Sequence, residues 1–385
     1  MKKKHLYIIG GNDTKLPPQI KKTSKVIFLD KEQKDFVNQF SLIKNFWERQ
    51  YILREKWLML QEKVFKKIQP KMSEDEDFRY ILSNLFFEAS PYKTNLMYQF
   101  FKIYLITDYI KQEKIESVFL LNLPKDINLF FSSNIKKLSI SVKIIASKKR
   151  KLSIKNLFRS YSISSLLYRF IVECCIKRRG LFTQNNESSK VVFSYYSHHS
   201  LNDSLSSKYF ADVSSLLNNN GYSWLFLSAG EGSKLSKGSK IVNENTYGFL
   251  DGYFLLSDFR NVITDYYRIK KKIRLIKLKD LFFFEGVDYL YLIKNDWLLS
   301  ITNVLLDVII FEKKFTNFFK TNKNIKEFIY LLEFQPWELM LNKVAQKYGV
   351  KTKGVAHAVI RSNLLQYIHP KSIHSFLYNP SYVGA

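Results

Sequence analysis

The chain alternates between short apolar segments of strand length and longer segments in which apolar residues recur at helical spacing. Residues 31–115 follow the helical pattern for most of their length, with a polar break at 72–77. The short segments carry few charges, which is typical of parallel strands buried on both faces. They predict strands at residues 6–9, 25–30, 117–121, 142–146, 191–196, 224–227, 328–332 and 350–359. Strands and helices in alternation predict an α/β protein.

The predicted elements fall into two parts, as a length of 385 residues also suggests. Residues 1–150 predict a helix-rich α/β domain, and residues 190–375 predict a Rossmann-like α/β domain. Between them, residues 151–189 predict a basic amphipathic connector that ends in a polar linker. Residues 376–385 are expected to begin a further, truncated C-terminal region.

The clearest local unit is a strand–helix–strand sequence near the C-terminus. The uncharged run 328–332 predicts a buried strand, and Pro336 suits the first position of a helix, where its missing N–H costs nothing. Helical spacing then continues to Gly349, a typical helix stop, and residues 350–359 resume as a strand. Such crossovers are right-handed and join parallel strands. Ligands of open parallel sheets bind beyond the carboxyl ends of the strands, so we expect a site there.

Three residues are predicted to be catalytic. Glu333 and His357 follow the two strands of this unit, so a carboxylate and an imidazole share one edge of the sheet. Glu285 precedes Gly286 after an apolar run, and a carboxylate placed there can also act as a general base toward a hydroxyl. Two alternatives remain open. Glu333 could be satisfied by backbone donors at the strand end, and Glu285 could belong to a simple turn.

A further set of polar residues is predicted to bind substrate. Arg361 offers bidentate contacts to a phosphate or a carboxylate. No third ligand lies at a diagnostic spacing from the two adjacent histidines at 198 and 199, so no metal site is predicted. Two members of the set have a local alternative: Gln335 could be a helix cap, and Glu338 could be an acid at the positive end of the helix dipole. The set comprises Arg361, Gln335, Glu338, His198, His199 and His369.

The charge balance favours an anionic partner. Lys and Arg number 61 against 34 Asp and Glu, which leaves a formal net charge of +27. The cations are dispersed and match no recognition motif, so nucleic acid is an unlikely partner. The adjacent Cys174 and Cys175 have no metal spacing and fit a reducing compartment. We therefore expect a cytoplasmic protein.

The connector suggests where an anionic surface could bind. Basic runs at 148–151 and 177–179 bracket an apolar stretch at 161–176. A helix of this kind can lie on the inner face of a membrane with its cations among the headgroups. The alternative is an ordinary packed helix with solvated basic ends.

Residues 333–338, with the sequence Glu-Phe-Gln-Pro-Trp-Glu, and residues 354–361, which contain Gly-Val-Ala-His, resemble paired motifs of bacterial surface carbohydrate biosynthesis proteins. The resemblance covers residues 328–380. That group is similar to glycosyltransferases of the GT-B architecture, in which two Rossmann-like domains face each other across the active site. The resemblance thus implies a GT-B-like fold whose donor-binding C-terminal domain is missing from this chain. His369-Pro370 is similar to the donor-binding His-Pro signature of some sialic-acid-type transferases.

The resemblance also implies an activity. It implies transfer of a sugar from a nucleotide-sugar donor to a glycan or lipid-linked acceptor, with no cofactor. Glu333 or Glu285 would then be the base, while His357 and Arg361 would stabilise the departing phosphate. The alternative is a non-catalytic basic protein that binds a membrane surface or nucleic acid.

Overall fold

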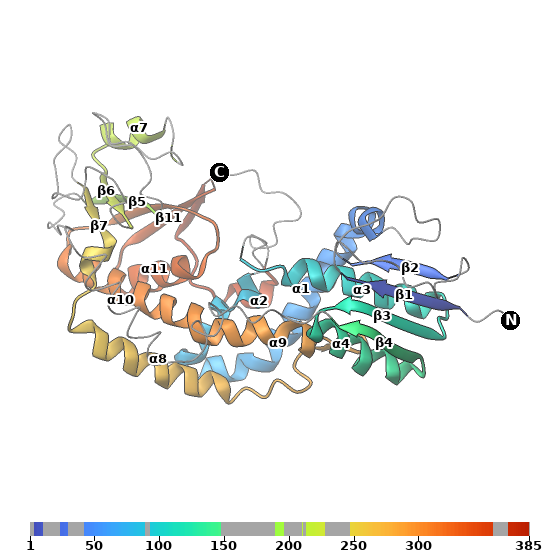
Figure 1. Ribbon diagram of the computed structural model, residues 1–385. Coiled ribbons are helices and arrows are strands. Elements are labelled where there is room, and N and C mark those ends of the chain that lie inside the picture. The colour runs from blue at the N-terminus through green and yellow to red at the C-terminus, as the bar shows by residue number, and fades with distance from the viewer. Residues whose placement is uncertain are drawn as a thin grey trace.

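The computed structural model describes residues 4–10, 24–29, 42–88, 93–147, 189–195, 210, 213–227, 247–356 and 369–384. Within these residues the chain is an α/β protein with two sheets of parallel strands, an arrangement compatible with Rossmann-like folds (Figure 1). A short antiparallel hairpin, β8 (Phe283–Phe284) and β9 (Val287–Asp288), lies outside both sheets.

The first sheet is formed by the N-terminal part of the chain in the strand order β2-β1-β3-β4, and its neighbouring strands are all parallel. Its strands are β1 (His5–Ile9), β2 (Lys25–Phe28), β3 (Ser117–Leu123) and β4 (Ser141–Ser147). Leu6 and Ile8 pack into a large core on one face, while Tyr7 and Ile9 belong to a small cluster on the other. Burial on both faces explains why these strands read as continuous apolar runs.

The second sheet has the strand order β12-β11-β10-β5-β6-β7 and is also parallel throughout. Its strands are β5 (Lys190–Ser194), β6 (Ser223–Phe226), β7 (Tyr247–Phe249), β10 (Glu327–Leu331), β11 (Lys351–Val355) and β12 (Tyr382–Gly384). Phe193 and Phe328 face the helices α10 and α11, whereas Val192 and Ile329 face the side of α7. The helices are α7 (Val213–Asn219), α10 (Leu305–Thr321) and α11 (Pro336–Lys347).

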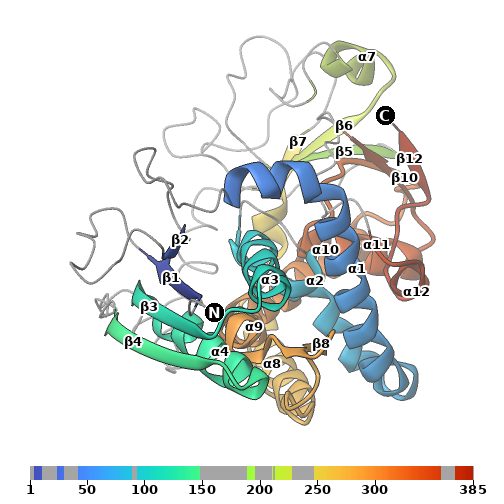
Figure 2. The same cartoon turned by 90° about the vertical axis from the view of Figure 1, so that its right-hand side faces the viewer.

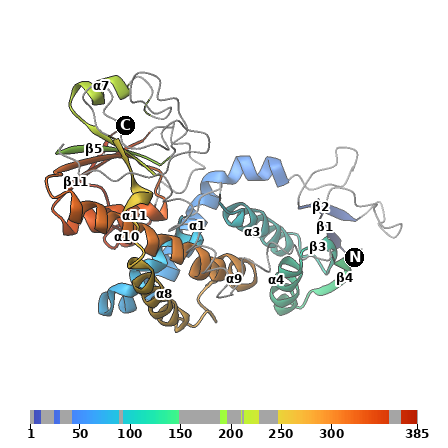
Figure 3. The ribbon, with the colours of Figure 1, turned by 60° about the vertical axis from the view of Figure 1, so that its left-hand side comes forward.

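A helical layer fills the space between the sheets, and the long helix α1 passes between them (Figure 2). Helix α8 lies on the outer side of this layer (Figure 3). The remaining helices are α1 (Leu42–Glu74), η1 (Glu76–Ser83), α2 (Leu85–Glu88), α3 (Leu96–Gln112), α4 (Lys125–Ile135), η2 (Lys136–Leu138), η5 (Leu250–Tyr253), α8 (Asp258–Arg274), α9 (Leu290–Leu299), the π-helix η6 (Ser300–Val304) and α12 (Lys371–His374).

One hydrophobic core joins the first sheet to helices from the second half of the chain. Residues of α8, α9 and η6 pack with residues of α1, α3 and α4 in this core. Helix α10 spans two cores, because Leu305 and Ile309 belong to this one while Phe315 and Phe318 pack under the second sheet. A packed helix shared in this way fixes how the two sheets face each other.

Both sheets direct the carboxyl ends of their strands toward the middle of the molecule. Strand β1 begins beside the N-terminus at one outer end, and β12 ends at the C-terminus, on the side of the second sheet that is nearer to the first sheet in Figure 1. Because all strands within each sheet are parallel, the other strands share these directions. The residues that follow the strands of both sheets therefore lie toward one central region.

The eight predicted strands are all present, and the crossover between β10 and β11 is parallel as expected. The domain boundaries differ from the prediction in two ways. The segment from Phe254 to Ile310 packs with the N-terminal part, because its apolar helix faces find their partners there. Residues 382–384 extend the second sheet beside β11, so the expectation that 376–385 begins a further region is not met by these residues.

Candidate active site

The site is built on the turn between β10 and α11. Strand β10 ends at Leu331, and Pro336 occupies the first turn of α11, as the sequence predicts. Gln335 precedes the helix with an extended backbone, φ −79° and ψ 154°. Phe334 has a φ of +54°, a conformation that costs energy for a side chain of its size. The turn therefore needs a partner that holds it.

That partner is Glu338, whose side chain is 1% exposed. Its carboxylate accepts the backbone N–H of Glu333 at 3.0 and 3.2 Å and that of Phe334 at 2.9 Å. Burial raises the pKa of Glu338 well above its ordinary value, while backbone N–H groups oppose the shift. Glu338 was predicted to bind substrate, but its carboxylate is enclosed and engaged by the turn. We assign it as a positioning residue.

A chain of hydrogen bonds orients the Glu333 carboxylate. Trp337 Nε1 donates to Gln335 Oε1 at 3.2 Å, and Gln335 Nε2 in turn donates to the Glu333 carboxylate. Trp337 is buried and stacks on Tyr195, the residue after β5, with ring centroids 5.5 Å apart. The direction in which Gln335 donates is thus set by a packed aromatic ring. The predicted residues Glu333 and Gln335 are brought together by this arrangement.

A second carboxylate reaches the site from the N-terminal half. Glu88 ends α2, is 3% exposed, and forms an ion pair with Lys93 at 2.7 Å. Its Oε2 has no hydrogen-bond partner among the described residues. Burial raises the pKa of Glu88, Lys93 opposes this, and the negative charge of Glu333 raises it further. Two acids from opposite halves therefore lie close enough to repel each other.

Sequence reasoning missed Glu88. The available signal was a carboxylate at the end of the otherwise apolar run Leu85-Phe86-Phe87. Acids are rarely buried unless they are paired, so such a position is a candidate for chemistry. Nothing local links it to Glu333, because the two residues belong to different halves of the chain.

His369 packs against the same turn. Its ring lies 5.6 Å from that of Phe334 and 6.1 Å from that of His374. Nδ1 is enclosed and has no hydrogen-bond partner among the described residues. Burial, helped by the nearby His374, lowers the pKa of His369 to about 4. His369 is therefore neutral at pH 7 and can offer a hydrogen bond without charge.

Four predicted residues lie outside the described residues, namely His357, Arg361, His198 and His199. Strand β11 ends at Val355, and the described residues continue to Ala356, just before His357. Strand β5 ends at Ser194, and the described residues continue to Tyr195. Their predicted roles stay predictions.

The structure separates Glu285 from this group. Glu285 and Gly286 form the turn of the β8–β9 hairpin with φ values of +48° and +79°, as tight hairpins require. The Glu285 carboxylate pairs with Lys56 of α1 and accepts a hydrogen bond from Tyr104 of α3 at 2.9 Å. The alternative of a simple turn, left open by the sequence, is the one that the backbone adopts.

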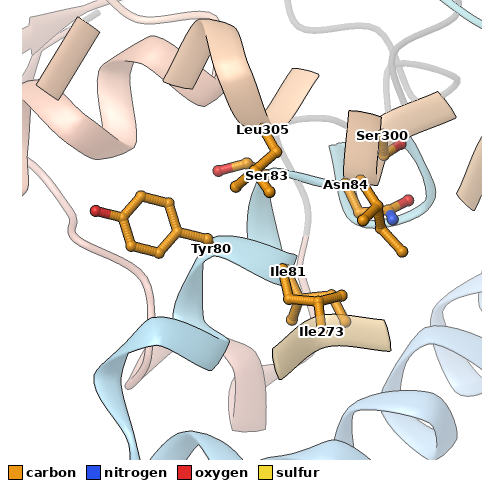
Figure 4. A pocket seen from close by; sticks show the side chains of 8 residues that line it. Tyr80, Ile81, Ser83, Asn84, Ile273, Ser300 and Leu305 are labelled. Carbon is orange, nitrogen blue, oxygen red and sulfur yellow. The ribbon is translucent and has the colours of Figure 1, made fainter. Parts of the chain in front are cut away.

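A separate small pocket lies between η1, α8 and η6 (Figure 4). Asn84 and Ser300 on its wall are hydrogen-bonded within the protein, since Ser300 Oγ donates to Asp296 and Asn84 Oδ1 accepts from Phe86. Ser83 Oγ has no partner among the described residues. The pocket has room for about one water molecule and none for a sugar, so we do not assign it as the active site.

In the part of the chain that the structure describes, no three His, Cys, Asp or Glu side chains gather as metal ligands would. None of the described helices is long and apolar enough to cross a membrane. Comparisons of the chain with known protein families, with curated proteins and with solved structures find no match. The functional argument therefore rests on the geometry around Glu333.

Proposed function

We propose that this protein transfers a sugar from a nucleotide-sugar donor to a glycan or lipid-linked acceptor, with Glu333 as the general base. The observation that carries the proposal is the oriented Glu333 carboxylate at the carboxyl end of β10, held by Gln335, with the buried Glu88 within electrostatic range. Two parallel sheets in one chain support a GT-B-like division into two domains. The resemblance of residues 333–338 to surface carbohydrate biosynthesis proteins agrees with it.

In the proposed reaction the Glu333 carboxylate removes the proton from an acceptor hydroxyl. The hydroxyl oxygen then attacks the anomeric carbon of the donor sugar, and the bond from that carbon to the phosphate oxygen breaks. The nucleotide leaves with the electron pair of that bond. Gln335 holds Glu333 in place through its hydrogen bond, which in turn depends on Trp337.

Two described residues, Glu88 and Lys93, support this role for Glu333. Burial and, further, the charge of Glu333 raise the pKa of Glu88, which favours a protonated Glu88 near the Glu333 carboxylate. Lys93 supplies a cation beside it, with a side chain 37% exposed and thus accessible to a phosphate. His357 and Arg361 are proposed to stabilise the leaving phosphate, a role that rests on the resemblance alone.

The test is nucleotide release from a panel of UDP-, GDP- and CMP-sugars, with and without glycan and lipid-linked acceptors. In Glu333→Gln the rate should fall about 100- to 10,000-fold, the usual contribution of a general base. Glu285→Gln is the matched control and should stay within about threefold of the wild type. Calorimetric titration of the same nucleotides measures donor binding separately.

Full activity in Glu333→Gln would overturn the assignment of the base. A protein that binds none of the nucleotides and turns over none of the donors would overturn the transferase proposal and favour the non-catalytic alternative. Equal losses in Glu333→Gln and Glu285→Gln would point to a general structural effect.

A further inference from the structure

A patch of cations and exposed apolar side chains lies on the helical layer, formed by α1, η2, the segment after α8 and the start of β8. We call it the basic–apolar patch. Its exposed apolar members are Leu275, Met59, Leu138 and Phe283, which are 64%, 49%, 42% and 38% exposed. Its cations are Lys63, Lys67, Lys137, Lys277 and Lys279. Exposed apolar groups set among cations mark an interaction surface more often than scattered single residues do.

Contacts join the three elements into one surface. Lys63 Nζ of α1 and Lys137 Nζ of η2 lie 5.7 and 6.0 Å from the centre of the Phe283 ring, so both flank the same exposed aromatic. Lys67 Nζ donates to the backbone carbonyl of Asp280 at 2.5 Å. This bond ties the segment before β8 to α1.

The α1 part of the patch follows from helical spacing. Met59, Lys63 and Lys67 are separated by four residues each, so their side chains lie along one face of the helix. Leu138 follows Lys137 directly in η2. The α1 and η2 members of the patch thus meet at Phe283, and Leu275, Lys277 and Lys279 lie on the segment that Lys67 ties to α1.

Most of the lysines in the patch are not neutralised by an acid of the described residues, so their charges can attract an anionic partner. Lys63, Lys137, Lys277 and Lys279 form no ion pair with another described residue. Two exposed acids lie nearby, Asp280 and Glu55, the latter one turn before Met59 on the same face of α1, while the Glu285 carboxylate is already paired with Lys56. The net field over the patch is positive, in keeping with the excess of +27 in the whole chain.

We infer that the basic–apolar patch docks this protein onto an anionic phospholipid surface. The lysines match phosphate headgroups, and the exposed Leu275, Leu138 and Met59 match the boundary between headgroups and acyl chains. Nucleic acid would use the cations but would leave three exposed aliphatic side chains without partners, because bases stack on aromatic rings. The inference stands independently of the proposed transferase activity.

The experiment is sedimentation of the full chain with vesicles of 30% phosphatidylglycerol and 70% phosphatidylcholine, and with vesicles of phosphatidylcholine alone. The patch variant reverses Lys63, Lys137, Lys277 and Lys279 to Glu. The matched control reverses the exposed Lys320, Lys323, Lys347 and Lys351 to Glu, with the same change in net charge. All variants keep the basic runs at 148–151 and 177–179, so any binding through the connector is common to them.

We expect the wild type to bind the anionic vesicles and to bind the neutral vesicles only weakly. The patch variant should lose at least tenfold in vesicle affinity, since each lysine near an anionic surface contributes about fivefold. The control variant should lose less than threefold. The double variant Leu275→Ser with Phe283→Ser, which keeps every charge, should also lose affinity.

Thermal unfolding checks that each variant is folded before it is compared. Equal losses in the patch and control variants would overturn the inference, because net charge alone would then explain binding. Absence of binding by the wild type would overturn it as well. Loss of duplex DNA binding in the patch variant with unchanged vesicle binding would assign the patch to a nucleic acid.

Discussion

Two acidic turns of this protein look alike in sequence and differ in structure. Glu333 and Glu285 both follow an apolar run, and both turns contain a bulky or charged residue with positive φ, +54° at Phe334 and +48° at Glu285. At Glu285 the carboxylate is neutralised by a neighbouring lysine, Lys56. At Glu333 a second acid from the other half of the chain, Glu88, lies within electrostatic range.

These different surroundings distinguish the carboxylate that is available for chemistry from the one that is engaged in an ion pair. Glu285 is held by a lysine and a tyrosine from two helices, as a structural ion pair is. The Glu333 carboxylate accepts a hydrogen bond from the side-chain amide of Gln335. The backbone N–H of Glu333 donates to a third acid, Glu338. Surroundings that set like charges side by side are typical of functional sites. Four predictions test this comparison.

The largest effect on stability is expected at Glu338. In Glu338→Ala the backbone N–H groups of Glu333 and Phe334 lose their acceptor, which should cost about 2 to 4 kcal/mol of unfolding free energy. Urea denaturation measures this loss of unfolding free energy. Glu285→Ala is the matched control, and its loss should be under about 1 kcal/mol. Glu338→Gln keeps one acceptor oxygen and should lie between the two. An unchanged urea midpoint in Glu338→Ala would show that the turn does not depend on this carboxylate.

The second effect is a pH dependence from His369. Its pKa is about 4 in the folded protein and near 6.5 when unfolded, so below pH 6.5 the unfolded chain binds more protons. Stability should fall as pH drops from about 6.5 to 4, by up to about 3 kcal/mol. In His369→Phe that part of the decline should disappear, whereas His5→Asn should keep it. Identical pH profiles of His369→Phe and the wild type would contradict the prediction.

The third effect is repulsion between Glu88 and Glu333. Burial and the charge of Glu333 raise the pKa of Glu88, so the folded state holds its proton longer than the unfolded state. Stability is then lost as pH rises through the raised pKa, and Glu88→Gln should escape this loss. A double-mutant cycle of Glu88→Gln and Glu333→Gln at pH 8 should give an unfavourable coupling of about 0.5 kcal/mol or more. Additive free energies would mean that the two acids do not interact.

The smallest effect is expected at the hairpin. The Lys56–Glu285 pair has side chains 25% and 35% exposed, so its removal in Glu285→Gln should cost about 0.2 to 1 kcal/mol. Donor turnover should be unaffected, which separates this carboxylate from Glu333. A loss of turnover confined to Glu285→Gln, with Glu333→Gln unaffected, would reverse the comparison and make Glu285 the base.

Much of the fold was predictable because it is local. The strands at 328–332 and 350–359, the helix start at Pro336 and the stop at Gly349, which has a φ of +68°, follow from apolar runs and from the backbone preferences of proline and glycine. The parallel pairing of β10 with β11 follows from the length of the crossover between them. Each of these signals lies within about twenty residues.

The site was predictable only in part. Glu333 and Gln335 were found because the carboxyl end of a parallel strand is a place where ligands bind. The role of Glu338 was missed, since its position in the first helical turn suggests contact with the helix dipole, whereas its carboxylate reaches back to the N–H groups of the turn. Glu285 looked equivalent to Glu333 until its partners from α1 and α3 were known.

The α/β class, the buried parallel strands and the turn that presents Glu333 follow from the amino-acid pattern, because those features depend on residues close together in the chain. Long-range packing places α8, α9 and the start of α10 in one core with the first sheet, and it brings Glu88 within electrostatic range of Glu333. The physical reason is that burial and charge act through space. A carboxylate acquires its chemistry from neighbours that the folded core brings to it, however distant they are in the chain.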